Sequence, residues 1–171
     1  LKMTFETPTT YCKYHFSGHR NCGIVFSPEE SKKLNRVCPK CGQKLTVGVV
    51  DRIEQLADRP KGYKRENAIP FISLVPLHEL ISTVYNIKQL YSKNVWMIYN
   101  KLIEKFNSEF NILLNISEEE LKTIADKKLV DIILSNREGK LKIKPGYDGV
   151  YGTIVLDDKE KIQKQKSLAE F

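Results

Sequence analysis

Four residues with the spacing of a metal site place the strongest constraint on how this chain folds. His19 and Cys22 form an H-x2-C pair, and Cys38 and Cys41 form a C-x2-C pair that begins sixteen positions after Cys22. Each spacing lets a tight turn point two ligand atoms at one ion, and a set of one nitrogen and three sulfurs suits tetrahedral Zn²⁺. Because all four positions are filled, the pattern predicts one structural zinc ion that stabilises loops too short to fold alone.

Two nearby residues leave the ligand set open. Cys12 and His15 lie just before the first pair, and Cys12 in place of His19 would give an all-cysteine site. His19 is preferred because its spacing to the next cysteine repeats the spacing of the second pair. Cys12 is otherwise expected as a small buried side chain on a strand over residues 11–16. Two paired motifs in a chain without a secretion signal indicate metal rather than disulfides.

Composition limits the remaining possibilities. The 171 residues are 41% hydrophobic and 29% charged, as in ordinary globular proteins. No run of eighteen apolar residues occurs, and the first residues, Leu1–Thr4, contain no apolar signal core. We therefore expect a cytoplasmic protein with no membrane partner.

Positive charge is concentrated in the first part of the chain. Residues 1–66 carry 13 Lys and Arg against 7 Asp and Glu, whereas residues 67–156 carry 11 against 10. Clustered basic charge on a small rigid module is typical of phosphate binding, although a solvated lysine-rich surface has the same composition.

The pattern of local signals predicts an α+β fold. A zinc-ribbon-like domain is expected over residues 1–58, with a capping box at Ser27 and Glu30 that starts a short helix, a strand over residues 43–50 and a helix over residues 51–57. Residues 59–76 contain three prolines and a glycine and are predicted to be a basic loop or linker.

The rest of the chain is predicted to be mainly helical. Helices are expected over residues 77–85, 92–106, 117–124 and 126–137, with residues 111–115 ambiguous between helix and strand. Apolar runs on either side of Pro145–Gly149 indicate a β-hairpin that completes a second domain, residues 77–156. Residues 157–171 are expected to be a tail.

Beyond these patterns, several ordered strings resemble the carboxy-terminal half of endonuclease Q over residues 11–156. These strings are Lys13–Gly23, Cys38–Gly42, Leu56–Pro60, Asn67–Phe71 and Pro145–Gly152. In that family an amino-terminal PHP (polymerase and histidinol phosphatase) domain carries the catalytic metals, and a zinc domain and a helical domain follow. The resemblance implies DNA repair by incision 5′ of deaminated bases (hypoxanthine, uracil) and abasic sites.

No phosphate-loop, dinucleotide or nucleophile-elbow motif occurs in the chain, and no PHP histidine motif occurs either. Catalysis is therefore not expected from these residues alone. We expect them to grip DNA through cations that contact phosphates and aromatic side chains that reach a base or the backbone. The predicted contacts are Lys13, Arg20, Arg36, Lys40, Arg52, Arg59, Lys61, Tyr63, Lys64, Arg65, Tyr147 and Tyr151.

Two other classes of function remain open at the level of sequence. The zinc domain and helices could form a protein interaction module that docks a catalytic domain or a replication partner without touching DNA. A free-standing RNA-binding zinc ribbon is also possible, but a ribbon alone would leave the basic loop and the hairpin without a role. Salt-dependent affinity for DNA, and a comparison of DNA with RNA, would separate these classes.

Overall fold

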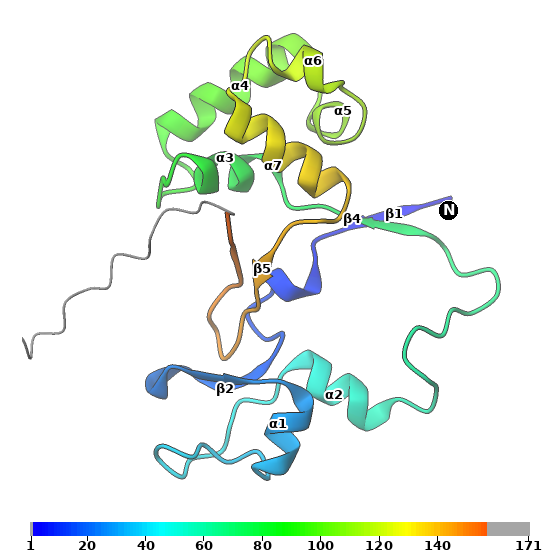
Figure 1. Ribbon diagram of the computed structural model, residues 1–171, viewed down its shortest axis with the longest axis vertical. Coiled ribbons are helices and arrows are strands. Elements are labelled where there is room, and N and C mark those ends of the chain that lie inside the picture. The colour runs from blue at the N-terminus through cyan, green and yellow to red at the C-terminus, as the bar shows by residue number, and fades with distance from the viewer. Residues whose placement is uncertain (1, 157–171) are drawn as a thin grey trace, which may run out of the picture.

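The structure is a computed structural model that describes residues 2–156, and it has the α+β architecture expected from the sequence. Figure 1 shows a group of helices at one end of the molecule and the cysteine-bearing module at the other, with a hairpin between them. The tail predicted over residues 157–171 lies outside the described residues.

The cysteine-bearing module, residues 9–56, is built from short elements. Its helix α1 begins at the predicted capping box, in which the Ser27 hydroxyl accepts from the Glu30 N–H and the Glu30 carboxylate accepts from the Ser27 N–H. The two strands of the module pair antiparallel. In chain order its elements are η1 (Thr9–Tyr11), β2 (Ser17–His19), η2 (Arg20–Cys22), β3 (Ile24–Phe26), α1 (Pro28–Lys33) and α2 (Val49–Leu56).

Two strands predicted in this module are wrong. Residues 11–16 begin in η1 and continue without regular structure, and residues 43–50 make only single bridges before α2 begins at Val49. The second segment cannot extend its pairing with β2 because the N–H groups of Val49 and Val50 already donate to the carbonyls of Tyr14 and His15. The β2–β3 pair, which the sequence analysis did not predict, supplies the regular ladder instead.

Five helices form the other end of the molecule. The side chains of Ser92, Ser108, Ser117 and Asp126 each accept a hydrogen bond from an N–H in the first turn of the helix that follows. The segment that was ambiguous in the sequence is helical. The helices are α3 (Leu77–Val84), α4 (Lys93–Phe106), α5 (Glu109–Leu114), α6 (Glu118–Leu121) and α7 (Lys127–Arg137).

The helices enclose the main apolar core. Most of its fully buried side chains lie on the inner faces of α3, α4, α5, α6 and α7, and each contributes on the order of 2 kcal/mol by leaving water. The largest are Leu77, Leu80, Ile81, Leu102, Ile112, Leu121, Leu129 and Ile133.

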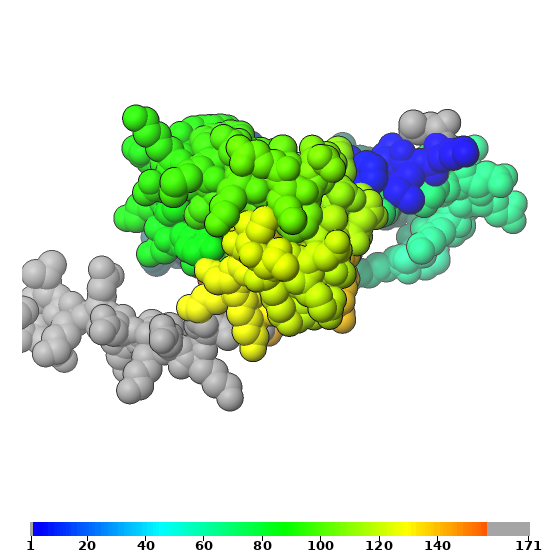
Figure 2. Space-filling view, turned by 90° about the horizontal axis from the view of Figure 1, so that it is seen from above, coloured from blue at the N-terminus to red at the C-terminus, as the bar shows by residue number. Residues whose placement is uncertain are grey.

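The segment predicted as a linker contains part of this core. β4 (Phe71–Ser73) pairs in parallel with β1 (Thr4–Glu6), and Leu74 and Val75 are buried among the helices. The Asn136 amide donates to the Val75 carbonyl and accepts from its N–H, both at 2.9 Å. The division of the chain at residues 59–76 stays a prediction. Every residue from 52 to 71 is exposed, and Figure 2 shows part of this loop (teal) extending beyond the helical end of the molecule.

The predicted hairpin connects the two ends. β5 (Ile143–Lys144) pairs with β6 (Thr153–Ile154), and the segment between them reaches the cysteine-bearing module. There the N–H groups of Gly146 and Gly152 donate to the carbonyls of Thr10 and Tyr11. The hairpin therefore belongs to the module as much as to the helices.

Candidate metal centre and nucleic-acid interface

The structure brings the four predicted metal ligands together. One ligand atom from each of His19, Cys22, Cys38 and Cys41 lies within 4.8 Å of every other, and Cys41 Sγ is 3.3 Å from His19 Nδ1. A tetrahedral ion with bonds of about 2.3 Å holds its ligands about 3.8 Å apart. The four side chains therefore lie close enough to bind one metal ion.

Local backbone geometry explains why these side chains converge. Gly23 and Gly42 follow a cysteine directly and have φ of 64° and 72°, a region that suits glycine. The Gly42 N–H donates to the Cys38 carbonyl, which closes the second turn. Burial opposes ionisation of Cys38, but the N–H groups of Cys41 and Lys40 offset this and lower the pKa of the thiol, whereas a hydrogen bond with Cys41 raises the pKa of the Cys22 thiol to about 11.

The alternative ligands lie elsewhere. Cys12 is exposed and is not part of the cluster, so the expectation of a buried Cys12 on a strand is wrong. His15 is buried against Phe16, and burial lowers the pKa of its imidazole. The described residues thus support His19 as the fourth ligand.

A buried carboxylate in the module connects α2 to β2 and to the chain that follows α1. Asp51 on α2 is 2% exposed and accepts hydrogen bonds from Ser17, Gln55 and Arg36, the last at 2.9 Å. Burial raises the pKa of this carboxyl, but the hydrogen bonds, led by that from Arg36, hold it far below its usual range. Arg36, a predicted phosphate contact, thus has two of its nitrogens engaged inside the module.

The other predicted DNA-contact residues fall into two groups. Lys13, Arg20, Lys40, Tyr147 and Tyr151 lie around the module and the hairpin. The remaining residues lie on α2 and the exposed loop; they are Arg52, Arg59, Lys61, Tyr63, Lys64 and Arg65. Within the loop group, the Arg59 guanidinium lies 4.7 Å from the centre of the Tyr63 ring. All twelve remain predicted contacts.

The hairpin turn fits tightly onto the module. Tyr147 packs over Gly18, where a Cβ would lie 2.5 Å from the ring, so this tyrosine has a structural role. Asp148 accepts from the Arg20 N–H and from the Thr46 hydroxyl, both at 2.5 Å. The sequence analysis missed Asp148 and Thr46, because nothing in the sequence indicates that residues 102 positions apart meet.

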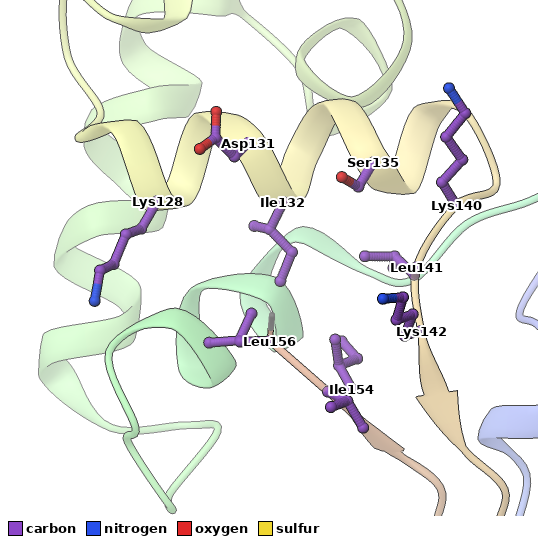
Figure 3. A pocket seen from close by; sticks show the side chains of 10 residues that line it. Lys128, Asp131, Ile132, Ser135, Lys140, Leu141, Lys142, Ile154 and Leu156 are labelled. Carbon is purple, nitrogen blue, oxygen red and sulfur yellow. The ribbon is translucent and has the colours of Figure 1, made fainter. Parts of the chain in front are cut away.

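A pocket of about 230 Å³ lies between α7 and the hairpin (Figure 3). The ammonium groups of Lys128 and Lys140 point away from its apolar side chains, and Lys140 forms an ion pair with Glu138. Its polar groups do not converge as they do around a substrate. Its apolar lining consists of Ile132, Leu141, Ile154, Val155 and Leu156.

A search of residues 2–156 for a membrane-spanning helix found none with the length and apolar character that this requires.

Comparison with known proteins finds similar sequences in two other organisms. Residues 76–140 match a family model described as the MJ0043 C-terminal domain. The chain is 35% identical over 142 residues to the uncharacterized protein MJ0043 of Methanocaldococcus jannaschii, and 29% identical over 146 residues to the uncharacterized protein YqxK of Bacillus subtilis. Each match covers 83% of this chain, but only 18% and 32% of the two relatives.

Two solved structures make the likeness more specific. The lesion-specific endonuclease PfuEndoQ from Pyrococcus furiosus matches 94% of this chain with a TM-score of 0.77 and 30% identity. Endonuclease Q in complex with a 27-mer duplex substrate that has an abasic lesion at the active site matches 96%, with a TM-score of 0.79 and 30% identity. The resemblance to the carboxy-terminal half of endonuclease Q is therefore confirmed. The chain spans 40% and 41% of those two proteins.

Proposed function

We propose that this chain is the DNA-binding part of a repair endonuclease that incises 5′ of hypoxanthine, uracil and abasic sites. In this proposal a PHP domain outside these residues cuts the strand. The observation that carries the proposal is the match of nearly the whole chain to endonuclease Q, one structure of which contains a duplex with an abasic lesion.

The proposal includes one structural zinc ion held by His19, Cys22, Cys38 and Cys41. One nitrogen and three sulfurs form a donor set that zinc favours, and four protein ligands leave no position for a substrate. When bound, the ion supplies folding free energy to a module whose strands have three residues each. Because these thiols must stay reduced, we also place the protein in the cytoplasm.

The grip on DNA is assigned to the basic side chains of the module and the loop. Arg20, Lys40 and Arg52 are exposed, and the loop adds four further cations and Tyr63. Each cation that contacts a phosphate releases counterions, so the affinity falls steeply with salt. These contacts hold the duplex without reading its sequence.

A salt series of fluorescence anisotropy on the metal-loaded chain tests the proposal. Matched duplexes and duplexes with one hypoxanthine or one abasic site would be compared. The double variant Arg20→Gln/Lys40→Gln is expected to reduce the slope of log affinity against log salt by about 2. The control Lys101→Gln/Lys105→Gln removes two exposed charges from α4 and is expected to leave the slope unchanged. No binding at low salt would refute the proposal.

One observation favours a second role as a docking module. Val49, Ile53 and Leu56 lie on one face of α2 and are 46%, 57% and 65% exposed, whereas Asp51 is buried. An exposed apolar stripe on a helix is typical of an interaction surface. Ile53→Lys/Leu56→Lys is expected to reduce incision by the full-length protein while DNA binding by this chain is retained. Loss of DNA binding instead would contradict this second role.

A further inference from the structure

The turn of the hairpin carries a carboxylate that reaches into the cysteine-bearing module. Asp148 and Gly149 form the centre of a type I′ turn, with φ of 42° and 83°. Tyr147 and Val150 exchange both of their backbone hydrogen bonds across this turn, and the Gly149 N–H donates to the Lys13 carbonyl. The backbone that positions the Asp148 side chain is therefore held at several points.

One oxygen of this carboxylate completes the turn that bears the first two metal ligands. It accepts a hydrogen bond of 2.5 Å from the N–H of Arg20, which begins η2 and lies between His19 and Cys22. Such an N–H is usually satisfied by a polar side chain at the position just before the helix. His19 holds that position and makes no capping hydrogen bond through its side chain. A residue 128 positions away supplies the acceptor instead.

The other oxygen secures the chain on the opposite side of His19. It accepts a hydrogen bond of 2.5 Å from the hydroxyl of Thr46, a residue that follows the second pair of ligands in the chain. Thr46 in turn exchanges both of its backbone hydrogen bonds with Gly18. Because Gly18 and Arg20 are the residues directly before and after His19, the chain on both sides of this ligand is held by hydrogen bonds that lead to one carboxylate.

This carboxylate is negatively charged and close to the histidine ligand. Burial raises the pKa of Asp148, but the hydrogen bonds from Arg20 and Thr46, with the charges of Arg20 and His19, lower it overall. On the side of the cluster, His19 Nδ1 is 3.3 Å from Cys41 Sγ. Carboxylates that support a histidine ligand from outside a metal site fix its orientation and strengthen metal binding.

We propose that Asp148 is a positioning residue for the metal centre: through Arg20 and Thr46 it holds the histidine ligand in place, and it couples metal binding to the position of the hairpin. The inference rests on the proposed function, in which the module holds one zinc ion. The coupling is reciprocal, because a contact that strengthens metal binding is itself strengthened by the metal to the same extent. Since Ile143 and Ile154 of this hairpin pack against the helical core, the coupling extends to the connection between the module and the helices.

Competition with a chromophoric chelator measures the zinc affinity of the chain and its variants. Asp148→Asn is informative because asparagine tolerates the positive φ of this position, whereas its amide has only one accepting oxygen. It is expected to weaken zinc binding by at least about tenfold. Thr46→Val removes one of the two hydrogen bonds and is expected to weaken zinc binding about fivefold. The control Glu104→Gln removes an exposed carboxylate from α4 and is expected to leave zinc binding unchanged.

Two further measurements separate a positioning role from a general loss of stability. With Co²⁺ bound at saturation in place of zinc, the visible absorption bands report the geometry of the ligands, and Asp148→Asn and Thr46→Val are expected to shift these bands. Amide hydrogen exchange at Gly149 and Val150 reports the hairpin. Asp148→Asn is expected to accelerate this exchange at least about tenfold more in the zinc-loaded chain than in the metal-free chain.

Equal zinc affinities of the wild type and Asp148→Asn, or cobalt bands unchanged in both variants, would overturn the positioning role while the proposed zinc site stands. Thr46→Val decides the affinity and the spectrum if Asp148→Asn does not fold. Equal acceleration of exchange with and without zinc would overturn the coupling to the hairpin. A wild-type chain that binds no zinc would overturn the proposed metal site and this inference together.

Discussion

Replacing Asp51 by alanine is expected to destabilise the folded protein by about 3 kcal/mol. The carboxylate is 2% exposed and accepts hydrogen bonds from Ser17, Arg36 and Gln55 at 2.8 to 2.9 Å. It therefore fixes α2 against β2 and against the chain that follows α1. No other described carboxylate is buried to this degree.

The magnitude follows from what the substitution leaves behind. Removing one partner of a buried ion pair costs about 3–5 kcal/mol. The lower end applies because the Arg36 side chain is 34% exposed and can turn toward water, whereas Ser17 is 1% exposed and loses its acceptor inside the module. For a domain of this size, about 3 kcal/mol lowers the melting temperature by roughly 6–12 °C.

Urea unfolding of the zinc-loaded wild type, Asp51→Ala, Arg36→Gln and the double variant measures this effect. The losses of unfolding free energy in the two single variants are expected to add up to about 1–2 kcal/mol more than the loss in the double variant, because the two side chains interact. Since the pKa of Asp51 is lowered in the folded state, its contribution is present above the ordinary carboxyl pKa near 4 and disappears only in stronger acid. A loss below about 1 kcal/mol at pH 7, or additive losses, would refute the reasoning.

Three further predictions address other parts of the molecule. Cys38→Ser is expected to abolish stoichiometric zinc binding, whereas Cys12→Ser is expected to keep one zinc ion per chain, because Cys12 lies outside the cluster. Elemental analysis measures the zinc content of both variants, and equal contents would contradict the ligand assignment. Gly18→Ala is expected to destabilise by about 2 kcal/mol or more in urea unfolding, since its Cβ would lie 2.5 Å from the Tyr147 ring; an unchanged midpoint would show that the hairpin does not pack there. Tyr99 has a pKa raised to about 12 by burial and by its hydrogen bond to a carboxylate, so its contribution is present below pH 10 and disappears as the pH rises through 12. Tyr99→Phe is expected to lower the free energy of unfolding by about 1 kcal/mol at pH 8 and to leave it unchanged above pH 12. A loss of stability that does not depend on pH would contradict this prediction.

Sequence patterns predicted the features that depend on neighbouring residues. The capping box at Ser27 is present because it needs only a hydroxyl and a carboxylate three positions apart. The metal cluster could be predicted for the same reason, since each pair of ligands lies on one turn. The turn at Asp148 and Gly149 also follows from its own residues.

Features that depend on distant residues were missed. The β1–β4 pair joins two segments of three residues, 67 positions apart, and so short a segment gives no clear period in the sequence. The prediction of a strand over residues 11–16 was wrong, because the carbonyls of Tyr14 and His15 accept hydrogen bonds from the first two N–H groups of α2. Arg36 and Asp51 could each be read as surface charges, and only the folded chain shows that they pair.

The DNA affinity of the chain with and without its metal tests the central claim most directly. The zinc-loaded chain, the same chain after chelation, and the chain after zinc is restored would be measured by anisotropy against a duplex with one abasic site. The account predicts one zinc ion per chain, salt-dependent binding that disappears on chelation, and recovery when zinc returns. Equal affinity of the stripped and loaded chains would contradict a DNA grip that depends on the metal-stabilised module.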